Sequence, residues 1–242
     1  PTALRSGATW GRWSRPGPPL AGRRPPWGCE PARPKDSEEL TLALREEIVN
    51  ACAALYETMG FKEITIRDIG EKTSFTRTSI YNYFQTKEEI FLALFQREYE
   101  LWREDLEAVL HGHDRMSIEE FSDALARTLE RRELLLKLLS VHLYDMEANS
   151  RMERLVAFKT AYGDSMGAVT RCLEKFFPQM AEGDIQRFIY GFFPFLFGVY
   201  PYTAVTDKQR EALREARVSS VTLSIYEIAR TLIETLLGLS LR

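Results

Sequence analysis

Apolar positions recur every three or four residues along most of the chain after residue 36, which is the period of an amphipathic helix. The first run predicts a helix from about residue 37 to residue 59 and consists of Ile48, Ala51, Cys52, Leu55 and Met59. Gly60 is suited to end this helix. No segment of the sequence alternates apolar and polar residues over the length of a strand. The hydrophobic pattern therefore predicts an all-α protein.

Four longer helical patterns follow, over residues 87–112, 117–129, 133–146 and 151–177. Ser117 and Glu120 form a capping box at the start of the second of these. The third, ELLLKLLSVHLYDM, is apolar on nearly every side, which predicts one central, buried helix. Thr206 and Gln209 can cap a short charged helix nearer the end of the chain.

Residues 65–87 show a different pattern, with two short helices joined by a tight turn and followed by the start of a third helix. The predicted N-caps of these helices are Thr65, Thr76 and Thr86. Asp68 and Glu89 stand three residues beyond the first and third caps, where they can complete capping boxes. Such closely spaced, capped helices are typical of a helix-turn-helix.

The second helix of this motif has two distinct sides. Ile80, Tyr83 and Phe84 share the side that should face inward. The other side has no apolar reason to be buried and carries Arg77, Thr78, Tyr81 and Asn82. A helix with this outer face can enter the major groove of DNA, although a helix-turn-helix used only for packing is the alternative.

The motif, TIRDIGEKTSFTRTSIYNYFQTK, resembles the DNA-binding motif of regulators of the tetracycline repressor (TetR) type. The run from Ser79 to Ile90 is its most specific part, and the resemblance extends from about residue 45 to residue 94. The chain departs from the family pattern at Ser74, where Gly is usual, and at Thr78, where a smaller residue is common. The resemblance implies a helix-turn-helix domain followed by a larger helical domain that binds a ligand and dimerises.

Side-chain chemistry divides the motif into two sets of predicted DNA contacts. Arg can bond guanine through two N–H groups, Asn can pair with adenine, and a Thr methyl can meet a thymine methyl. Base contacts are predicted for Arg77, Thr78, Ser79, Tyr81 and Asn82. Contacts to phosphates, or mixed contacts, are predicted for Thr65, Arg67, Thr76, Tyr83 and Lys87.

Two strongly apolar helices near the end of the chain predict a homodimer interface. Residues 188–205 carry no charge, and as a helix they would be just long enough to span a membrane, which is the alternative. Pro194, Pro201 and the charged helices on both sides favour a buried or interface helix instead. With the apolar helix at 221–239, the chain has more apolar surface than one core of this size needs. The predicted interface residues are Phe188, Phe192, Phe195, Val221, Ile225, Ile228, Leu232 and Leu236.

Aromatic and Met residues on the middle helices are usual core material, but an effector pocket in an all-helical domain would be built from the same residues. The predicted pocket residues are Trp102, Phe121, His142, Tyr144, Phe158, Tyr162 and Met166. The resemblance implies that the effector is a small, mainly apolar molecule.

Evidence for catalysis or metal binding is weak. Residues 163–167, GDSMG, match the G-x-S-x-G elbow of serine hydrolases, which needs a preceding strand and a later His. Here a helix precedes the motif, and His111, His113 and His142 all come earlier. No ligand-spaced partner accompanies the first two histidines. We predict no catalytic residue, no metal and no cofactor; an all-helical enzyme using Ser165 or His142 is the alternative.

The composition bears on the compartment in which the protein works and on the structure of residues 1–36. The net charge of −3 argues against a wholly basic surface but allows a small DNA-reading module. Three cysteines, none in a C-x-x-C pair, suit a reducing cytosol. Residues 1–36 hold eight of the eleven prolines and predict a disordered extension, with a basic arm on DNA as the alternative.

Together, these features predict three segments: an extension at 1–36, a helix-turn-helix domain at 37–86 and a ligand-binding and dimerisation domain at 87–242. The resemblance implies a cytoplasmic bacterial repressor. It would bind a near-palindromic double-stranded DNA operator as a homodimer and leave it when an effector binds. No membrane association and no enzymatic activity are expected.

Overall fold

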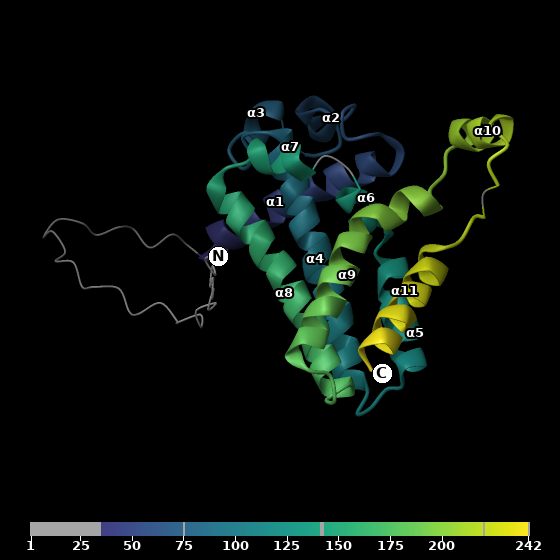
Figure 1. Ribbon diagram of the computed structural model, residues 1–242. Coiled ribbons are helices and arrows are strands. Elements are labelled where there is room, and N and C mark those ends of the chain that lie inside the picture. Colours follow the sequence, from purple (N-terminus) through teal and green to yellow (C-terminus); the bar gives the residue numbers. More distant parts are fainter. Residues whose placement is uncertain (1–34, 75, 141–142, 220, 242) are drawn as a thin grey trace, which may run out of the picture.

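The computed structural model describes residues 35–74, 76–140, 143–219 and 221–241, and within these residues every regular element is a helix (Figure 1). The helices are α1 (Lys35–Thr58), α2 (Ile66–Glu71), α3 (Arg77–Ile80), α4 (Lys87–Gly112), α5 (Ile118–Arg131), α6 (Glu133–Leu139), α7 (Leu143–Ala148), α8 (Met152–Phe176), α9 (Glu182–Thr203), α10 (Asp207–Glu215) and α11 (Ile225–Ser240). The all-α prediction is confirmed. The predicted extension at 1–36 lies outside the described residues, apart from its last two, which begin α1.

The first three helices gather at one end of the molecule, and α4 runs from them into the body (Figure 1). Helix α4 packs along α8, while α11 packs against both α5 and α9. Helix α6 reaches α9, and α7 lies against α4 near the first three helices. This arrangement places the start of α4 and the start of α8 beside the helix-turn-helix.

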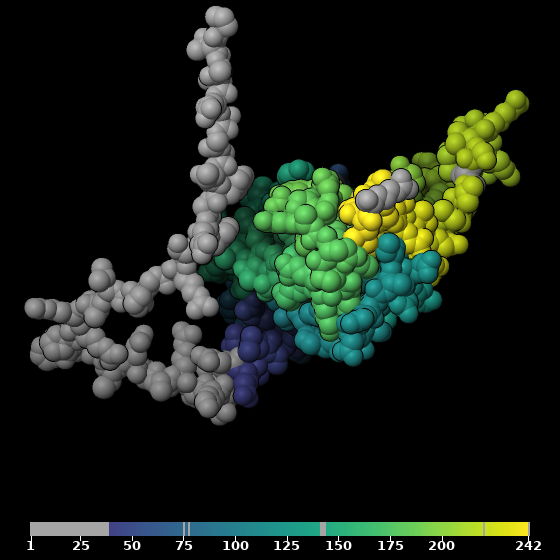
Figure 2. Space-filling view, turned by 60° about the horizontal axis from the view of Figure 1, so that its bottom comes forward, coloured from purple at the N-terminus to yellow at the C-terminus, as the bar shows by residue number. Residues whose placement is uncertain are grey.

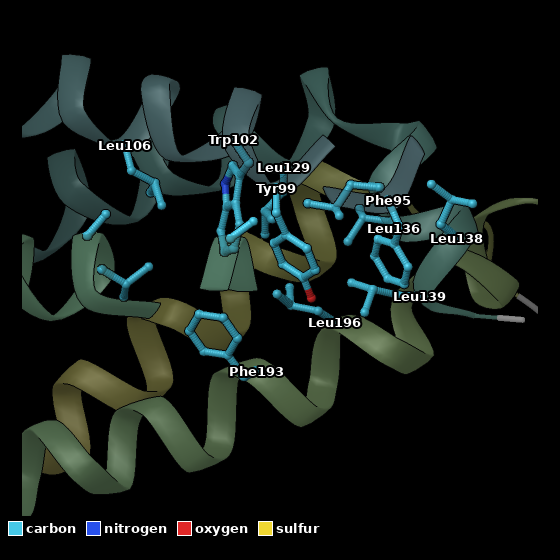
Figure 3. Packing of buried hydrophobic residues seen from close by; sticks show 14 of the residues in the cluster. Phe95, Tyr99, Trp102, Leu106, Leu129, Leu136, Leu138, Leu139, Phe193 and Leu196 are labelled. Atoms are coloured by element: carbon cyan, nitrogen blue, oxygen red, sulfur yellow. The ribbon is translucent and has the colours of Figure 1, made fainter. Parts of the chain in front are cut away.

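In the core of the body, aromatic and leucine side chains of α4, α5, α6 and α9 pack together (Figure 3), and α8 adds further buried residues. Trp102 is fully buried, and its indole N–H donates to Thr128 Oγ1 at 3.0 Å. Its ring lies 5.9 Å from that of Phe193, centroid to centroid. Phe121 and Phe158 are almost fully buried as well. These three predicted pocket residues, Trp102, Phe121 and Phe158, are therefore core residues of the subunit.

Ser165, the centre of the elbow-like GDSMG sequence, lies within α8 and is fully buried. Its hydroxyl donates to the carbonyl oxygens of Tyr99 and Ala161, each 3.0 Å away. The serine thus has helix on both sides and no exposed surface, which is the opposite of a nucleophile elbow.

Most predicted caps are formed. Capping boxes start α2, α5 and α10 at Thr65, Ser117 and Thr206, and Thr76 caps α3 through the N–H of Ser79. The predicted box at Thr86 is only half formed. Thr86 accepts from the N–H of Glu89, but the Glu89 carboxylate turns inward, because it pairs with a cation from α8.

The predicted single helix at 133–146 is wrong. Helix α6 ends at Leu139, and α7 begins at Leu143. Ser140 is the C-cap of α6, and its hydroxyl donates to the carbonyl oxygen of Lys137 at 2.8 Å, a local bond that competes with continued helix. A pattern that is apolar on every side of a helix does not reveal the break between α6 and α7, because apolar residues continue on both sides of it.

Among the described helices, none is by itself long and apolar enough to cross a membrane; α9 and α10 meet that criterion only as a pair bent by 82°.

Candidate functional site

The helix-turn-helix is held together by local bonds. Thr65 Oγ1 accepts from the N–H of Asp68 at 3.3 Å, and Asp68 Oδ2 accepts from the N–H of Thr65 at 2.8 Å. Ile69 is fully buried against α1. Helix α3 is one turn long, and hydrogen-bonded turns extend it as far as Phe84, whose N–H donates to the carbonyl oxygen of Ile80. The recognition segment is thus residues 77–84.

The structure separates the two sides of this segment as the sequence pattern predicts. Ile80 and Phe84 are fully buried, whereas Thr78, Tyr81 and Asn82 are exposed. Ser79 is half-buried, and its hydroxyl lies 2.9 Å from that of the cap, Thr76. The side chain of Arg77, predicted to contact bases, lies outside the described part of the structure. The polar set that is described therefore shares one accessible surface.

The predicted phosphate-binding residues differ in availability. Thr65, Arg67 and Thr76 are exposed. Arg67 pairs with Glu71 at 3.0 Å across two exposed side chains, a contact weak enough to be exchanged for a phosphate. Lys87 is different: its ammonium donates to the carbonyl oxygens of Phe61 and Ile64, at 2.9 and 3.1 Å. Lys87 therefore fastens the chain after α1 to the start of α4, which the sequence analysis did not anticipate.

A carboxylate from α1 holds the turn of the motif. Glu47 Oε1 accepts from the N–H of Ser74 at 2.6 Å, and Glu47 Oε2 accepts from its hydroxyl at 3.0 Å. The family pattern has Gly at this position, which has no hydroxyl to offer. The departure from Gly at Ser74 was visible in the sequence. Its hydrogen-bond partner, Glu47, lies 27 residues earlier and could be identified only from the fold.

We expect Glu47→Ala to destabilise the motif by about 1–2 kcal/mol, because two hydrogen bonds to a charged but partly exposed group are lost. Faster hydrogen exchange of the Ser74 amide, together with a lower unfolding temperature, would show the effect. Glu57→Ala, at an exposed position of the same helix, is the matched control. Equal amide exchange in the two variants would refute a role for Glu47 in holding the turn.

Where the recognition segment meets the body, the buried carboxylate of Glu89 forms a two-pronged ion pair with the partly exposed guanidinium of Arg151. Glu89 is 1% exposed. Arg151 Nε lies 2.6 Å from Glu89 Oε1, and Arg151 Nη2 lies 2.9 Å from Oε2. Backbone N–H groups of Arg151 and Gln85 also donate to the carboxylate. Burial alone would raise the pKa of Glu89, but these donors outweigh it and hold the pKa at about 2.

The same junction includes the end of the recognition segment itself. The carbonyl oxygen of Tyr83 accepts from the guanidinium groups of Arg151 and Arg154, at 3.4 and 3.3 Å. Thr86 Oγ1 donates to the carbonyl oxygen of Asn149 at 3.0 Å. The turn between α7 and α8 is thus bonded directly to the segment that joins α3 to α4. We call these two bonded segments, residues 83–89 and residues 149–154, the α8 junction.

A second contact links the body to the end of α1. Lys137, on α6, donates to the carbonyl oxygen of Tyr56, and its ammonium lies 4.3 Å from the centroid of the Tyr56 ring. Burial lowers the pKa of Lys137. Because the last carbonyls of a helix lack partners within it, this lysine satisfies a group that α1 leaves open.

A cavity of about 370 Å³ opens between α7, α8 and α9. It is lined by Tyr144, Tyr162, Met166, Ile189, Tyr190, Phe193, Pro194 and Phe197. Three of the predicted pocket residues, Tyr144, Tyr162 and Met166, line it, whereas His142 lies outside the described residues. The sequence analysis missed the five residues on α9, because it assigned that whole helix to the dimer interface.

The residues predicted to form the dimer interface fall into two groups. Phe188 and Phe192 are fully buried and Ile225 is nearly so, which commits them to the subunit's own core. Phe195, Ile228, Leu232 and Leu236 are half-buried, and Val221 is 79% exposed. Of the predicted set, Phe195, Val221, Ile228, Leu232 and Leu236 therefore keep exposed surface, on the outer sides of α9 and α11 or, for Val221, just before α11.

The fold and the exposed recognition segment define a helix-turn-helix DNA-binding protein with a helical body that contains a cavity. Residues 48–94 match the model of the bacterial regulatory proteins of the tetR family, and residues 96–242 match that of the tetracyclin repressor-like C-terminal domain. The chain belongs to the TetR family of transcriptional regulators.

Solved structures share this fold. A TetR-family transcriptional regulator from Mesorhizobium loti is 17% identical, with a TM-score of 0.55 over 82% of this chain and 97% of that one. The fatty acid degradation regulator FadR from Bacillus halodurans is 15% identical, with a TM-score of 0.53 over 80% and 97%. FadR from Bacillus subtilis, in complex with stearoyl-CoA, is 15% identical, with a TM-score of 0.51 over 79% and 96%. A comparison with curated proteins found no significant match.

Proposed function

We propose that this protein is a ligand-responsive repressor. It binds a near-palindromic operator as a homodimer in the bacterial cytoplasm and leaves the DNA when a small, mainly apolar molecule occupies the cavity between α7, α8 and α9. The observation that carries this proposal is the α8 junction, since it connects the wall of the cavity to the recognition segment through bonds between named atoms.

The DNA-binding step rests on the accessible side of the recognition segment. Asn82 can pair with adenine, and Thr78 offers a methyl and a hydroxyl to base edges. Exposed Thr65 and Thr76, at the caps of the two helices, are placed to meet phosphates on either side. One subunit would read one half of the operator.

A second copy is needed to read the other half, because successive major grooves lie about 34–36 Å apart. The outer sides of α9 and α11 support this assembly. Helix α9 exposes Tyr202 and α11 exposes Leu239, and neither residue lines the cavity. The two helices approach closely at Gly191, where a Cβ would stand 3.0 Å from a methyl group of Leu236, so they can present one continuous face.

The cavity supports an effector that is mainly apolar. Its lining consists of aromatic, aliphatic and Met side chains, with only tyrosine hydroxyls as polar groups. Its volume lies within the usual range for small-molecule sites. The Tyr162 hydroxyl is protonated at neutral pH and can donate a hydrogen bond to an effector; burial raises its pKa further above the ordinary value of 10.0. A related fold, that of the Bacillus subtilis FadR, holds stearoyl-CoA.

The release step follows from the short path between the cavity and the recognition segment. Tyr144 lines the cavity from α7, and Asn149, just beyond the end of α7, bonds Thr86. An effector that moves α7 must shift this turn together with the Arg151 contacts to Tyr83 and Glu89. Coupling of this kind is typically about 1–3 kcal/mol and acts equally on effector and operator binding.

The test of DNA recognition is a titration of the purified protein with DNA from just upstream of its own gene, beside a scrambled control, at two salt concentrations. Asn82→Ala should weaken specific binding by about 1–3 kcal/mol, because one bidentate base contact is lost. Gln85→Ala, at an exposed amide residue outside the predicted contact set, should leave binding unchanged. Equal, salt-sensitive binding of both DNAs by the natural protein would count against a specific operator at this site.

A further inference from the structure

The segment between α9 and α11 stands away from its own subunit. Helix α10 projects from the body in Figure 1 and again in the rotated view of Figure 2. None of its nine residues is buried, and it makes no extended contact with another helix in the described part of the chain. It therefore contributes nothing to the core of the subunit that carries it.

Yet the local structure of α10 is well specified at both ends. Thr206 and Gln209 exchange hydrogen bonds of 2.9 and 3.2 Å in a complete capping box. Arg217 has a φ of 55°, and the N–H of Val218 donates to the carbonyl oxygen of Leu213 at 3.0 Å, which is a Schellman ending. A helix of this length is marginal in water without packing. The caps stabilise α10 locally, although none of its residues is buried against the rest of the chain.

The connection from α10 to α11 exposes apolar side chains. Val218 is 53% exposed, Val221 is 79% exposed and Leu223 is 40% exposed. They lie just before α11, so they extend the exposed apolar surface of α9 and α11 onto the projecting segment. Apolar residues gathered on a projecting segment are typical of an interaction surface.

We infer that residues 204–219 and 221–224 belong to an arm that packs on a second copy of this chain. This inference rests on the proposed homodimer, because the arm begins at the end of α9 and returns at the start of α11, the two helices proposed to form the interface. The arm adds contacts beyond that interface and fixes how one subunit sits on the other. The second copy covers Val218, Val221 and Leu223.

Charge makes DNA a poor partner for the arm. Residues 207–217 carry four basic and three acidic side chains. Two of the four cations are paired within α10, Arg210 with Asp207 and Arg214 with Glu211. A DNA-binding segment gains affinity by placing unpaired cations near phosphates, and this arrangement offers few of them.

The test is the dimer dissociation constant of Val221→Asp, measured by sedimentation over a dilution series. A carboxylate placed in an apolar contact with the partner should raise this constant at least about tenfold, whereas at an exposed position it should leave the subunit's unfolding temperature unchanged. Leu223→Asp should act in the same direction. Val156→Asp is the matched control, because Val156 is 55% exposed on α8, at the other side of the subunit.

Three outcomes would overturn the inference, and they are distinguishable. A natural protein that stays monomeric at every concentration would remove the proposed homodimer together with the arm contact. A dimer whose dissociation constant is the same in all variants would leave the homodimer standing and refute the arm. A variant that dimerises normally but binds operator DNA more weakly would assign the arm to DNA instead.

Discussion

Arg151→Ala should lower the free energy of unfolding by about 2–3 kcal/mol, because it leaves the buried Glu89 carboxylate without its charged partner, whose own side chain is 36% exposed to solvent. The guanidinium also donates to the carbonyl oxygen of Tyr83, so the end of the recognition segment loses a bond as well. The effect should exceed that of any surface ion pair. Arg67→Ala, which removes an exposed pair with Glu71, should cost no more than about 1 kcal/mol and is the control.

The difference in unfolding free energy between the natural protein and Arg151→Ala should also depend on pH, which gives a second measurement of the ion pair. In the natural protein the pKa of Glu89 is about 2, below its ordinary value of 4.5. A lowered pKa stabilises the fold above the ordinary value, and this stabilisation is lost as the pH falls from about 4.5 towards 2. In Arg151→Ala, burial should raise the pKa of Glu89. Lowering the pH should therefore protonate this carboxyl group and remove the cost of a buried, unpaired charge. The difference in unfolding free energy should therefore shrink as the pH falls below 4.5.

Urea unfolding at pH 7 and at pH 3.5 would measure both the loss of unfolding free energy in Arg151→Ala and its change with pH.

Combining Arg151→Met with Glu89→Leu should recover most of the stability, because it replaces the two charged side chains by apolar groups of similar volume. The double variant should nevertheless respond more weakly to an effector, since of the bonds between the turn and the recognition segment only those of Arg154 to Tyr83 and Thr86 to Asn149 remain. A loss below about 1 kcal/mol in Arg151→Ala would contradict an ion pair with a buried carboxylate at this junction.

Trp102→Ala should cost a further large amount, about 3–5 kcal/mol, because it opens a cavity where α4 meets α5 and α9. The indole is fully buried and bonds Thr128. Trp102→Phe keeps most of the volume and should cost less. Tyr144→Ala, at a side chain that is 89% exposed on the rim of the effector cavity, should hardly change stability.

Denaturant unfolding of these variants separates a core role from a pocket role for Trp102. A core residue reduces stability when truncated, whatever its effect on ligand binding. If Trp102→Ala kept its unfolding free energy and lost only effector affinity, the ring would be a pocket residue, as predicted from the sequence, and not part of the core packing in Figure 3.

The helix-turn-helix could be predicted closely from the sequence because its structure is encoded locally. The caps at Thr65, Thr76 and Thr86 each accept from an N–H group three residues further on, so spacing alone reveals them. The same holds for the exposed side of residues 77–84, which follows from helical periodicity. The break between α6 and α7 was missed because apolar residues continue on both sides of it.

The pocket and the junction could not be predicted in this way. Tyr144, Tyr162 and Phe193 meet only because α7, α8 and α9 come together, and an aromatic residue of a cavity is indistinguishable in sequence from one of the core. The same limit applies to Trp102 and Phe188, because periodicity does not identify the neighbours that bury both side chains completely within this chain.

The sequence by itself determined the helical class, the recognition segment and the family, because periodicity, caps and a short specific motif are properties of neighbouring residues. Only the tertiary structure decided which aromatic residues line a cavity, how Glu89 and Arg151 come together across 62 residues, and that α10 stands apart from its own subunit. Those features depend on contacts between distant segments, whose partners are selected by packing and charge in three dimensions.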